Sequence, residues 1–194
     1  MDRKKELGSF YTPQCLADWI VKRIVAEATI QSVLEPSCGD GSFISALSYY
    51  NKFFNITAVD IDDKAVKAVT EKYSDINIYC EDFLFSNIKE KFDLIIGNPP
   101  YISKRNISQT QIKKCKAIHA SNGLKSKEIH NIWTAFVLKS CSLVNPAGII
   151  SFVLPAEFLQ VKYAKEIRDF IIKNFDRTEI LSFRNFKFDD TEQN

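Results

Sequence analysis

The sequence predicts an α/β fold in which helices cover both faces of a doubly wound parallel sheet. Short apolar runs alternate along the chain with segments of helical periodicity. Two stretches rich in glycine and proline, residues 36–41 and 97–100, directly follow two of these runs. The chain has 194 residues, 45% of them hydrophobic, and we interpret residues 1–194 as one domain with a full core.

Each element follows from a local pattern. Thr12-Pro13 predicts a helix start, a capping hydroxyl before proline at the first helical position, and the helix should run to about Ala28. Apolar runs predict strands at residues 32–34, 56–59, 76–80, 92–96, 149–154 and 178–183. Helical spacing predicts helices at residues 42–50, 62–73, 109–118, 132–144 and 160–174. The residues Asn-Pro-Ala-Gly at 145–148 predict a turn.

The composition excludes several classes of protein. No apolar run reaches the roughly 18–20 residues that a bilayer span needs, and residues 1–6 lead into no apolar core of the signal-peptide type. Five cysteines without a Cys-x-x-Cys pair argue against a disulfide framework and a zinc site, so we expect no metal. We therefore expect a reduced, cytoplasmic protein with no membrane partner.

The first polar stretch joins a strand to a helix, where doubly wound folds bind nucleotide-like ligands. Gly39 and Gly41 lack Cβ atoms, which would let a ligand lie against the backbone. The stretch is neither Gly-x-Gly-x-x-Gly nor a phosphate loop, and it contains Glu35 and Asp40 but no cation. Carboxylates repel pyrophosphate but favour a ligand with an ammonium and a sulfonium. The sequence therefore predicts S-adenosylmethionine (SAM) as the cofactor.

The next two strand ends supply further cofactor candidates. Asp60 follows the second strand, where an acid can bind ribose hydroxyls. After the third strand, Asp82 could accept a hydrogen bond from the adenine amino group while Phe83 packs on its ring. A lone loop carboxylate is usually solvated or a helix cap, but such residues at three successive strand ends favour a site. The candidate cofactor residues are Tyr11, Thr12, Glu35, Ser37, Gly39, Asp40, Gly41, Asp60, Ile61, Asp82, Phe83 and Asn98.

The second polar stretch, Asn98-Pro99-Pro100-Tyr101, follows the fourth strand. Consecutive prolines donate no backbone hydrogen bond and hold an extended chain, so their carbonyls are free to accept. If the Asn98 side chain and the Pro99 carbonyl accept both protons of an exocyclic amine, its lone pair could attack a sulfonium methyl group. No strong base is needed, because the proton becomes acidic only as the methyl group arrives. The candidate catalytic residues are Asn98, Pro99, Pro100 and Tyr101.

These motifs, in this order, resemble the gamma-class, TaqI-like adenine-N6 DNA methyltransferases of restriction–modification systems. The matching segments are residues 8–13, 35–41, 60, 82–83 and 98–101. The resemblance implies a Rossmann-like SAM-dependent methyltransferase sheet that transfers a methyl group from SAM to N6 of adenine in double-stranded DNA. It also implies that Thr12 contacts the methionine part of SAM and that Glu35 contacts its ammonium group.

Aromatic residues for the substrate base follow from the same resemblance. Phe136 is a candidate for packing near the adenine, and Phe188 for stacking on it together with Tyr101. By helical spacing alone, Phe136 and Trp133 are more typical of core residues. An adenine cannot reach a pocket at a sheet edge while it is stacked in a duplex, so the mechanism implies base flipping.

A basic segment follows the candidate catalytic loop. Between Tyr101 and His130 there are seven Lys and Arg residues and one acid, Glu128, although the whole chain has a net charge of only +2. Such a run is usually a solvated loop, but its place beside the catalytic loop favours contact with DNA phosphates. The candidate phosphate contacts are Lys104, Arg105, Lys113 and Lys114.

Family members continue past these motifs with more strands and a target-recognition domain. We therefore expect a catalytic domain without a target-recognition domain and with the last strands of its sheet incomplete. A fragment, one half of a split enzyme and a decayed gene would each fit this pattern. The DNA sequence would then be read elsewhere, for example by a separate target-recognition or restriction subunit. The same amine-holding chemistry allows methylation of a protein glutamine or an RNA guanine amine, but the short segment before the glycine loop disfavours the protein-glutamine enzymes. A SAM-binding module without turnover is the remaining alternative.

Overall fold

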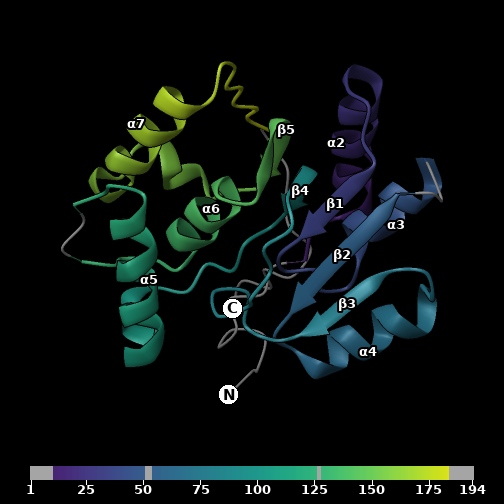
Figure 1. Cartoon of the computed structure of the whole chain (residues 1–194), viewed down its shortest axis with the longest axis horizontal. Helices are drawn as coiled ribbons and strands as arrows, with labels where there is room; N and C mark the ends of the chain where they lie inside the picture. Colours follow the sequence, from purple (N-terminus) through teal and green to yellow (C-terminus); the bar gives the residue numbers. More distant parts are fainter. Residues whose placement is uncertain (1–10, 51–53, 126–127, 184–194) are drawn as a thin grey trace.

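The computed structural model describes residues 11–50, 54–125 and 128–183. Its sheet has five parallel strands in the order β3-β2-β1-β4-β5 (Figure 1), which confirms the predicted fold class. The strands are β1 (Ser32–Glu35), β2 (Asn55–Asp60), β3 (Asn77–Cys80), β4 (Phe92–Gly97) and β5 (Val144–Phe152). The α-helices are α2 (Gln14–Glu27), α3 (Ser42–Tyr50), α4 (Asp63–Lys72), α5 (Gln109–Ser121), α6 (Trp133–Cys141) and α7 (Lys165–Asn174). Within these ranges no helix is long and apolar enough to cross a membrane.

The sheet is covered on both faces because its strands bury alternate residues in two cores. Val33 of β1 belongs to the core formed with α2, α3 and α4, whereas its neighbour Leu34 belongs to the core formed with α5, α6 and α7. Leu94 and Ile95 of β4 divide in the same way, as expected where successive side chains point to opposite faces of a strand. The carboxyl ends of β1 to β4 therefore meet at one edge, where both polar stretches lie.

The expected turn at residues 145–148 is instead a bulge within β5. Phe92 pairs with Val144 and Leu94 pairs with Ile149, so the four residues between lie opposite one residue of β4. Gly148 permits this close packing, because a Cβ there would lie 2.7 Å from Val144 Cγ2. The turn-type residues mark an irregularity inside the strand rather than its beginning.

Two helix starts also differ from the predictions. Helix α2 begins at Gln14 with Pro13 in the capping position and no side-chain cap, while Thr12 is buried at the sheet edge instead. The helix expected over residues 160–174 is divided into the short 3-10 helix η3 (Lys162–Ala164) and α7. The preceding 3-10 helix η2 (Ala156–Leu159) is tied to α7 by Arg168, whose Nη1 donates to the Phe158 carbonyl at 2.6 Å.

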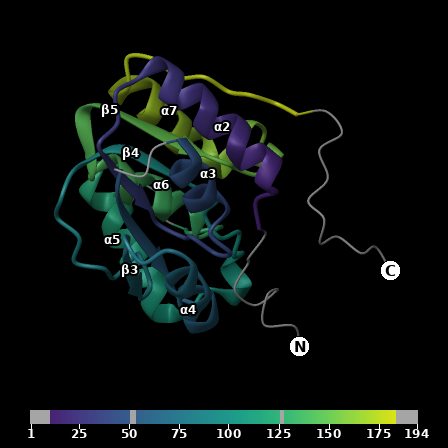
Figure 2. The same cartoon turned by 90° about the vertical axis from the view of Figure 1, so that its right-hand side faces the viewer.

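The prediction of a strand at residues 178–183 is wrong. This segment runs beside α2 (Figure 2), where Arg23 forms an ion pair with Glu179 at 2.8 Å and the Trp19 ring meets Phe183 edge-on. A strand needs a neighbouring strand for its backbone hydrogen bonds, and β5 is the last strand of the sheet in the part of the chain that the structure describes. Ile180 and Leu181 are about half exposed as a result.

The buried His119 should make the fold sensitive to acid. His119 of α5 is 4% exposed, its Nε2 lies 3.0 Å from Thr134 Oγ1, and burial lowers its pKa to about 4, which the nearby Glu166 opposes only in part. Below pH 6.5 the unfolded chain takes up a proton that the folded chain refuses, so stability should fall by up to about 3 kcal/mol as the pH falls from 6.5 to 4. Urea unfolding at several pH values measures this. His119→Gln should remove most of the dependence, and an equal loss in the variant would contradict the assignment.

Candidate cofactor pocket and catalytic loop

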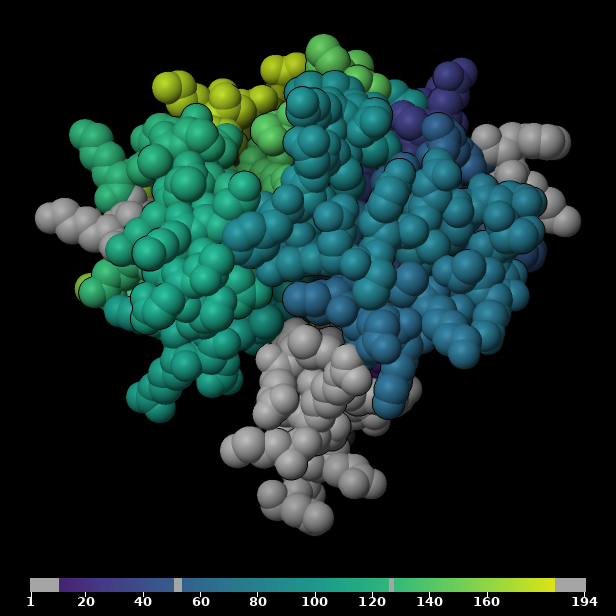
Figure 3. All heavy atoms as spheres, turned by 60° about the horizontal axis from the view of Figure 1, so that its bottom comes forward, coloured from purple at the N-terminus to yellow at the C-terminus, as the bar shows by residue number. Residues whose placement is uncertain are grey.

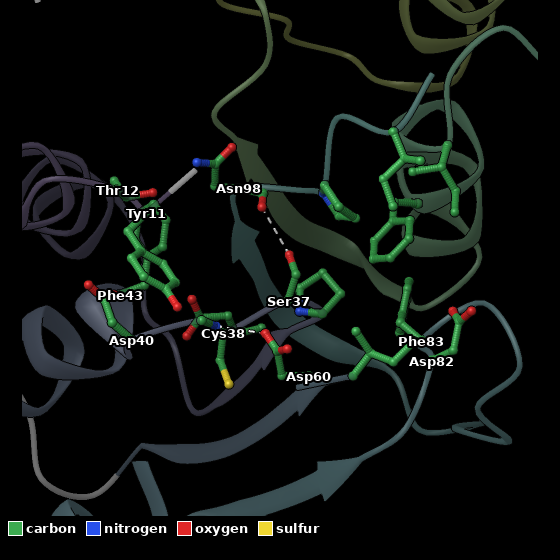
Figure 4. Close-up of a pocket in the computed structure, with 18 of the residues that line it drawn as sticks. Tyr11, Thr12, Ser37, Cys38, Asp40, Phe43, Asp60, Asp82, Phe83 and Asn98 are labelled. Atoms are coloured by element: carbon green, nitrogen blue, oxygen red, sulfur yellow. Dashed lines mark hydrogen bonds between the residues drawn. The ribbon is translucent and has the colours of Figure 1, made fainter. Parts of the chain in front are cut away.

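The carboxyl ends of β1 to β4 open into a pocket of about 980 Å³, part of which is open to solvent. Every predicted cofactor residue except Gly41 lines it. In Figure 4, Tyr11, Thr12 and Asp40 lie at one end and Asp82 and Phe83 at the other. The pocket collects residues from four strand ends that are far apart in the sequence.

Glu35, the last residue of β1, is the most unusual charge in this pocket. It is 1% exposed, and its Oε2 has no hydrogen-bond partner among the described residues. Burial, together with the neighbouring carboxylates of Asp60 and Asp40, raises the pKa of Glu35 well above its usual range. A buried carboxylate without a partner is costly. The arrangement therefore fits a ligand that brings a cationic group to Glu35.

Gly39 and Asp60 connect the glycine loop to β2. The Gly39 N–H donates to Asp60 Oδ2 at 2.8 Å, and the Asp62 N–H donates to Asp60 Oδ1 at 2.8 Å. Burial nevertheless raises the pKa of Asp60. Gly39 has φ +51°, and a Cβ there would lie 3.0 Å from the Tyr11 ring. A glycine is thus needed both for the backbone conformation and for the approach of Tyr11.

Gly41 packs against α4. It does not line the pocket, and a Cβ there would lie 3.1 Å from Val69 Cγ2 on α4. Its φ of +81° is also a conformation that favours glycine. Gly41 therefore lets the start of α3 pack closely against α4, and its contact with a ligand stays a prediction.

Asp82 is fixed by one local and one distant hydrogen bond. The Leu84 N–H donates to Asp82 Oδ1 at 2.9 Å, and Gln111 Nε2 of α5 donates to Asp82 Oδ2 at 2.9 Å. Gln111 also lines the pocket. No local sequence pattern indicates Gln111 as a site residue, because it lies 29 residues from Asp82 in a segment whose strongest signal is its basic charge.

The catalytic loop lies across the pocket from these acids and is tied to the glycine loop. Ser37 Oγ donates to the Asn98 carbonyl oxygen at 3.1 Å (Figure 4). The Tyr101 hydroxyl lies 2.6 Å from Asn98 Oδ1 and 2.8 Å from the Val153 carbonyl oxygen, and burial raises its pKa. Tyr101 therefore orients the Asn98 carboxamide, a role that no local sequence pattern indicates. Pro100 lines the pocket, whereas Pro99 is buried and does not.

Of the aromatic candidates on α6, the structure brings Phe136 to the pocket. Phe136 of α6 is 5% exposed, lines the pocket and packs against Phe83, with 5.2 Å between the ring centroids. It is thus both a core residue and a pocket wall on the side of Asp82, and its contact with a substrate base stays a prediction. Trp133 is fully buried core. Phe188 lies outside the described residues.

The basic segment borders the pocket. Its 3-10 helix η1 (Lys104–Asn106) and helix α5 contribute Asn106 and Gln111 to the pocket lining. Figure 3 looks onto this end of the molecule, where the teal-green segment forms one side and the blue segment of β3 and α4 the other. Lys104 pairs with Glu128 at 2.9 Å, and Lys114 Nζ lies 5.7 Å from the centre of the Phe85 ring. Arg105 and Lys113 are exposed.

Residues 42–188 match the family model of the Eco57I restriction-modification methylases. The chain belongs to this family. The family prediction from the motifs is therefore confirmed. The five-stranded sheet is the Rossmann-like sheet of the class I SAM-dependent methyltransferases, as the sequence predicts.

The chain is also similar to individual methyltransferases of known name. It is 30% identical to the Type II methyltransferase M.AccI of Acinetobacter calcoaceticus, over 98% of this chain and 36% of the relative. It is 29% identical to M.HincII of Haemophilus influenzae, over 96% of this chain and 36% of the relative. Among solved structures, the methyltransferase subunit of a type I restriction-modification system from Streptococcus thermophilus has a TM-score of 0.68 at 17% identity, covering 84% of this chain and 38% of that subunit. The chain thus spans just over a third of these relatives.

Proposed function

We propose that this chain forms the catalytic part of a site-specific DNA methyltransferase that transfers a methyl group from SAM to N6 of adenine. One observation carries the proposal. The buried carboxylate of Glu35 and two residues of the catalytic loop, Asn98 and Pro100, line one pocket, and the bond of 3.1 Å from Ser37 to Asn98 ties their two segments together. Membership of a restriction-modification methylase family supports the same conclusion.

The donor set of the pocket fits SAM. Glu35 has a buried oxygen without a hydrogen-bond partner among the described residues, which suits an ammonium group; Asp60 and Asp82 also line the pocket, and we assign them to the ribose hydroxyls and the adenine amino group. Among the residues that the structure describes, the pocket lining includes acids but no Lys or Arg, which favours a cationic ligand. When bound, SAM supplies an electrophilic methyl group.

The catalytic loop would hold the amine that receives the methyl group. The Asn98 carboxamide oxygen accepts one amine proton and the Pro99 carbonyl accepts the other, which favours a pyramidal nitrogen with an available lone pair. Asn98 Oδ1 can accept from Tyr101 and from the amine together, because a carbonyl oxygen has two lone pairs. These interactions strengthen as positive charge develops on the nitrogen, so they stabilise the transition state more than the ground state.

The proposed substrate is double-stranded DNA with a flipped adenine. Tyr101 and Phe188 are proposed to stack on the extruded base, and the basic segment to contact phosphates. The relatives are nearly three times as long as this chain. We therefore assign the choice of DNA sequence to residues or to a subunit beyond the part that the structure describes.

Transfer of label from tritiated SAM tests the proposal. The chain is incubated with adenine-containing duplex DNA, with a duplex of alternating guanine and cytosine, with RNA and with a glutamine-containing protein substrate. Recovery of the label as N6-methyldeoxyadenosine after nuclease digestion, from the first duplex alone, is the expected result. Label only in cytosine, RNA or protein would contradict the proposal, as would SAM binding without transfer to any of the four.

The basic segment should give DNA binding a strong salt dependence. Changing Arg105 and Lys113 to glutamine removes two exposed charges. If both contact phosphates, the slope of log K against log salt concentration should become shallower by about 2, since each contact contributes about 0.9. Fluorescence anisotropy with a labelled duplex measures this slope. Lys67→Gln on α4, at an exposed pair with Glu71, is the control, and an unchanged slope in the double variant would remove the segment from the interface.

A further inference from the structure

The loop after β3, residues 81–86, is held by a half-buried lysine of α6. Lys139 Nζ donates to the Phe83 carbonyl oxygen, to the Ser86 carbonyl oxygen at 2.9 Å and to Ser86 Oγ at 2.8 Å. An ammonium group has three N–H donors, so the loop uses all of them. The same nitrogen lies 4.6 Å from the centre of the Phe83 ring, within range of a cation–π interaction.

A second side chain holds the same loop from α5. Gln111 Nε2 donates to Asp82 Oδ2 at 2.9 Å. The other end of this amide is fixed by the start of its own helix, because Gln111 Oε1 accepts from Ser108 Oγ at 3.0 Å and from the Ser108 N–H at 3.2 Å. The orientation of Gln111 is therefore set before any ligand arrives, and its amide nitrogen points at Asp82.

We propose that Lys139 and Gln111 are positioning residues that hold Asp82 and Phe83 in the conformation that receives the adenine of the cofactor. The inference rests on the proposed SAM-binding function. Lys139 is not among the residues that line the pocket, so it acts through Phe83 and Ser86 rather than by contact with the ligand. Gln111 acts through the carboxylate that is expected to accept from the adenine amino group.

Lys139 and Gln111 together form a clamp on the loop at residues 81–86. The position of this clamp predicts whether SAM binding or methyl transfer depends on it. A loop that is already ordered loses less conformational freedom when a ligand binds, and the saving appears as affinity. The hydrogen bonds of the clamp all go to residues 82–86, at the Asp82 end of the pocket, rather than to the catalytic loop. Removing it should therefore raise Kd and KM for SAM and leave kcat at saturating SAM within about twofold.

The charge of Lys139 makes this affinity dependent on pH. Burial and the nearby Lys114 of α5 lower the pKa of Lys139 to about 8, while Glu81 and Asp82 of the loop oppose that shift. Above pH 8 the amine loses a proton and with it one of the three hydrogen bonds. SAM affinity should therefore decrease as the pH rises from 7 to 9. An arginine at this position stays protonated throughout that range.

Calorimetric titration of the full chain with SAM at pH 7 and pH 9 tests the proposal. Lys139→Met and Gln111→Met should each raise Kd by about 10-fold or more at pH 7, the size expected for loss of a charge-assisted hydrogen bond. Lys139→Arg should bind SAM more tightly than Lys139→Met, and its Kd for SAM should not rise between pH 7 and pH 9. The control is Lys165→Met, which removes an exposed lysine of α7 paired with Asp169.

The outcomes separate this inference from the function on which it rests. Wild-type protein that fails to bind SAM at either pH contradicts the proposed function itself. Wild-type binding with Kd values within twofold for Lys139→Met and Gln111→Met overturns the clamp alone. Gln111 lies half-buried at the first turn of α5, so Gln111→Met provides a test even if Lys139→Met lowers the melting temperature. A loss of kcat with unchanged KM in either variant would also overturn the clamp.

Discussion

Replacing Asn98 with alanine should lower kcat for methyl transfer to DNA by about 100-fold or more, while Kd for SAM changes by no more than a few-fold. The variant removes the carboxamide that is proposed to accept a proton of the substrate amine as charge develops on its nitrogen. Loss of one such transition-state hydrogen bond typically costs 100- to 1000-fold in kcat. Single-turnover transfer of label at saturating DNA measures the chemical step directly, and calorimetry measures SAM binding.

Tyr101→Phe is the matched control for Asn98→Ala. It keeps the aromatic ring but removes the hydroxyl that lies 2.6 Å from Asn98 Oδ1. Because the hydroxyl orients the carboxamide and does not itself accept the amine proton, the loss in kcat should be smaller, about 10-fold. An Asn98→Ala variant that keeps more than a tenth of the wild-type kcat would show that the amine is held elsewhere.

The sequence predicts the parts of the site that depend on strand ends. Glu35, Asp60 and Asp82 each follow an apolar run, and parallel strands necessarily bring such residues to one edge. The same logic places Asn98 beside them, and the structure collects all four in one pocket. Local sequence is sufficient here because the distance between strand ends is set by the sheet rather than by side-chain packing.

The missed features depend on contacts between distant segments. Gln111 reaches Asp82 only because α5 packs at the sheet edge, and Lys139 reaches Phe83 across 56 residues of sequence. Gly41 satisfies two needs, a positive φ and close packing on Val69, and the sequence pattern cannot tell these from access to a ligand. Residues 178–183 are strand-like in composition, but a strand also requires a partner.

Replacing Glu35 with glutamine should change stability and SAM affinity in opposite directions. Without SAM, the buried carboxyl lies near Asp60 and Asp40, and its raised pKa means that the folded protein holds a proton more tightly than the unfolded chain. The stability from that proton is fully present below the unfolded pKa of about 4.3 and is lost as the pH rises through the raised folded value. At pH 8 the variant should therefore unfold at a higher urea concentration than the wild type.

With SAM bound, the wild type should instead be more stable than Glu35→Gln. The ammonium group of SAM needs an ionised partner, and truncating one side of a buried charge pair typically costs 2 kcal/mol or more, so Kd should rise by about 30-fold or more in Glu35→Gln. A ligand stabilises a protein in proportion to the logarithm of its concentration over Kd, so saturating SAM should raise the wild-type melting temperature above that of the variant. Glu71→Gln, which neutralises an exposed carboxylate of α4, should leave both the order and the affinity unchanged.

Glu35, which lines the pocket, and Lys139, which holds the loop that contains Asp82, together predict a bell-shaped pH dependence of SAM affinity. On the acid side, binding must release the proton of Glu35, so the affinity falls as the pH drops through the raised pKa of that carboxyl. On the alkaline side, Lys139 loses its proton with a pKa of about 8 and releases the loop that contains Asp82. Glu35→Gln should remove the acid limb alone and Lys139→Arg the alkaline limb alone. If either variant removes both limbs, the two groups titrate as one coupled system, and the separate roles of Glu35 and Lys139 would have to be abandoned.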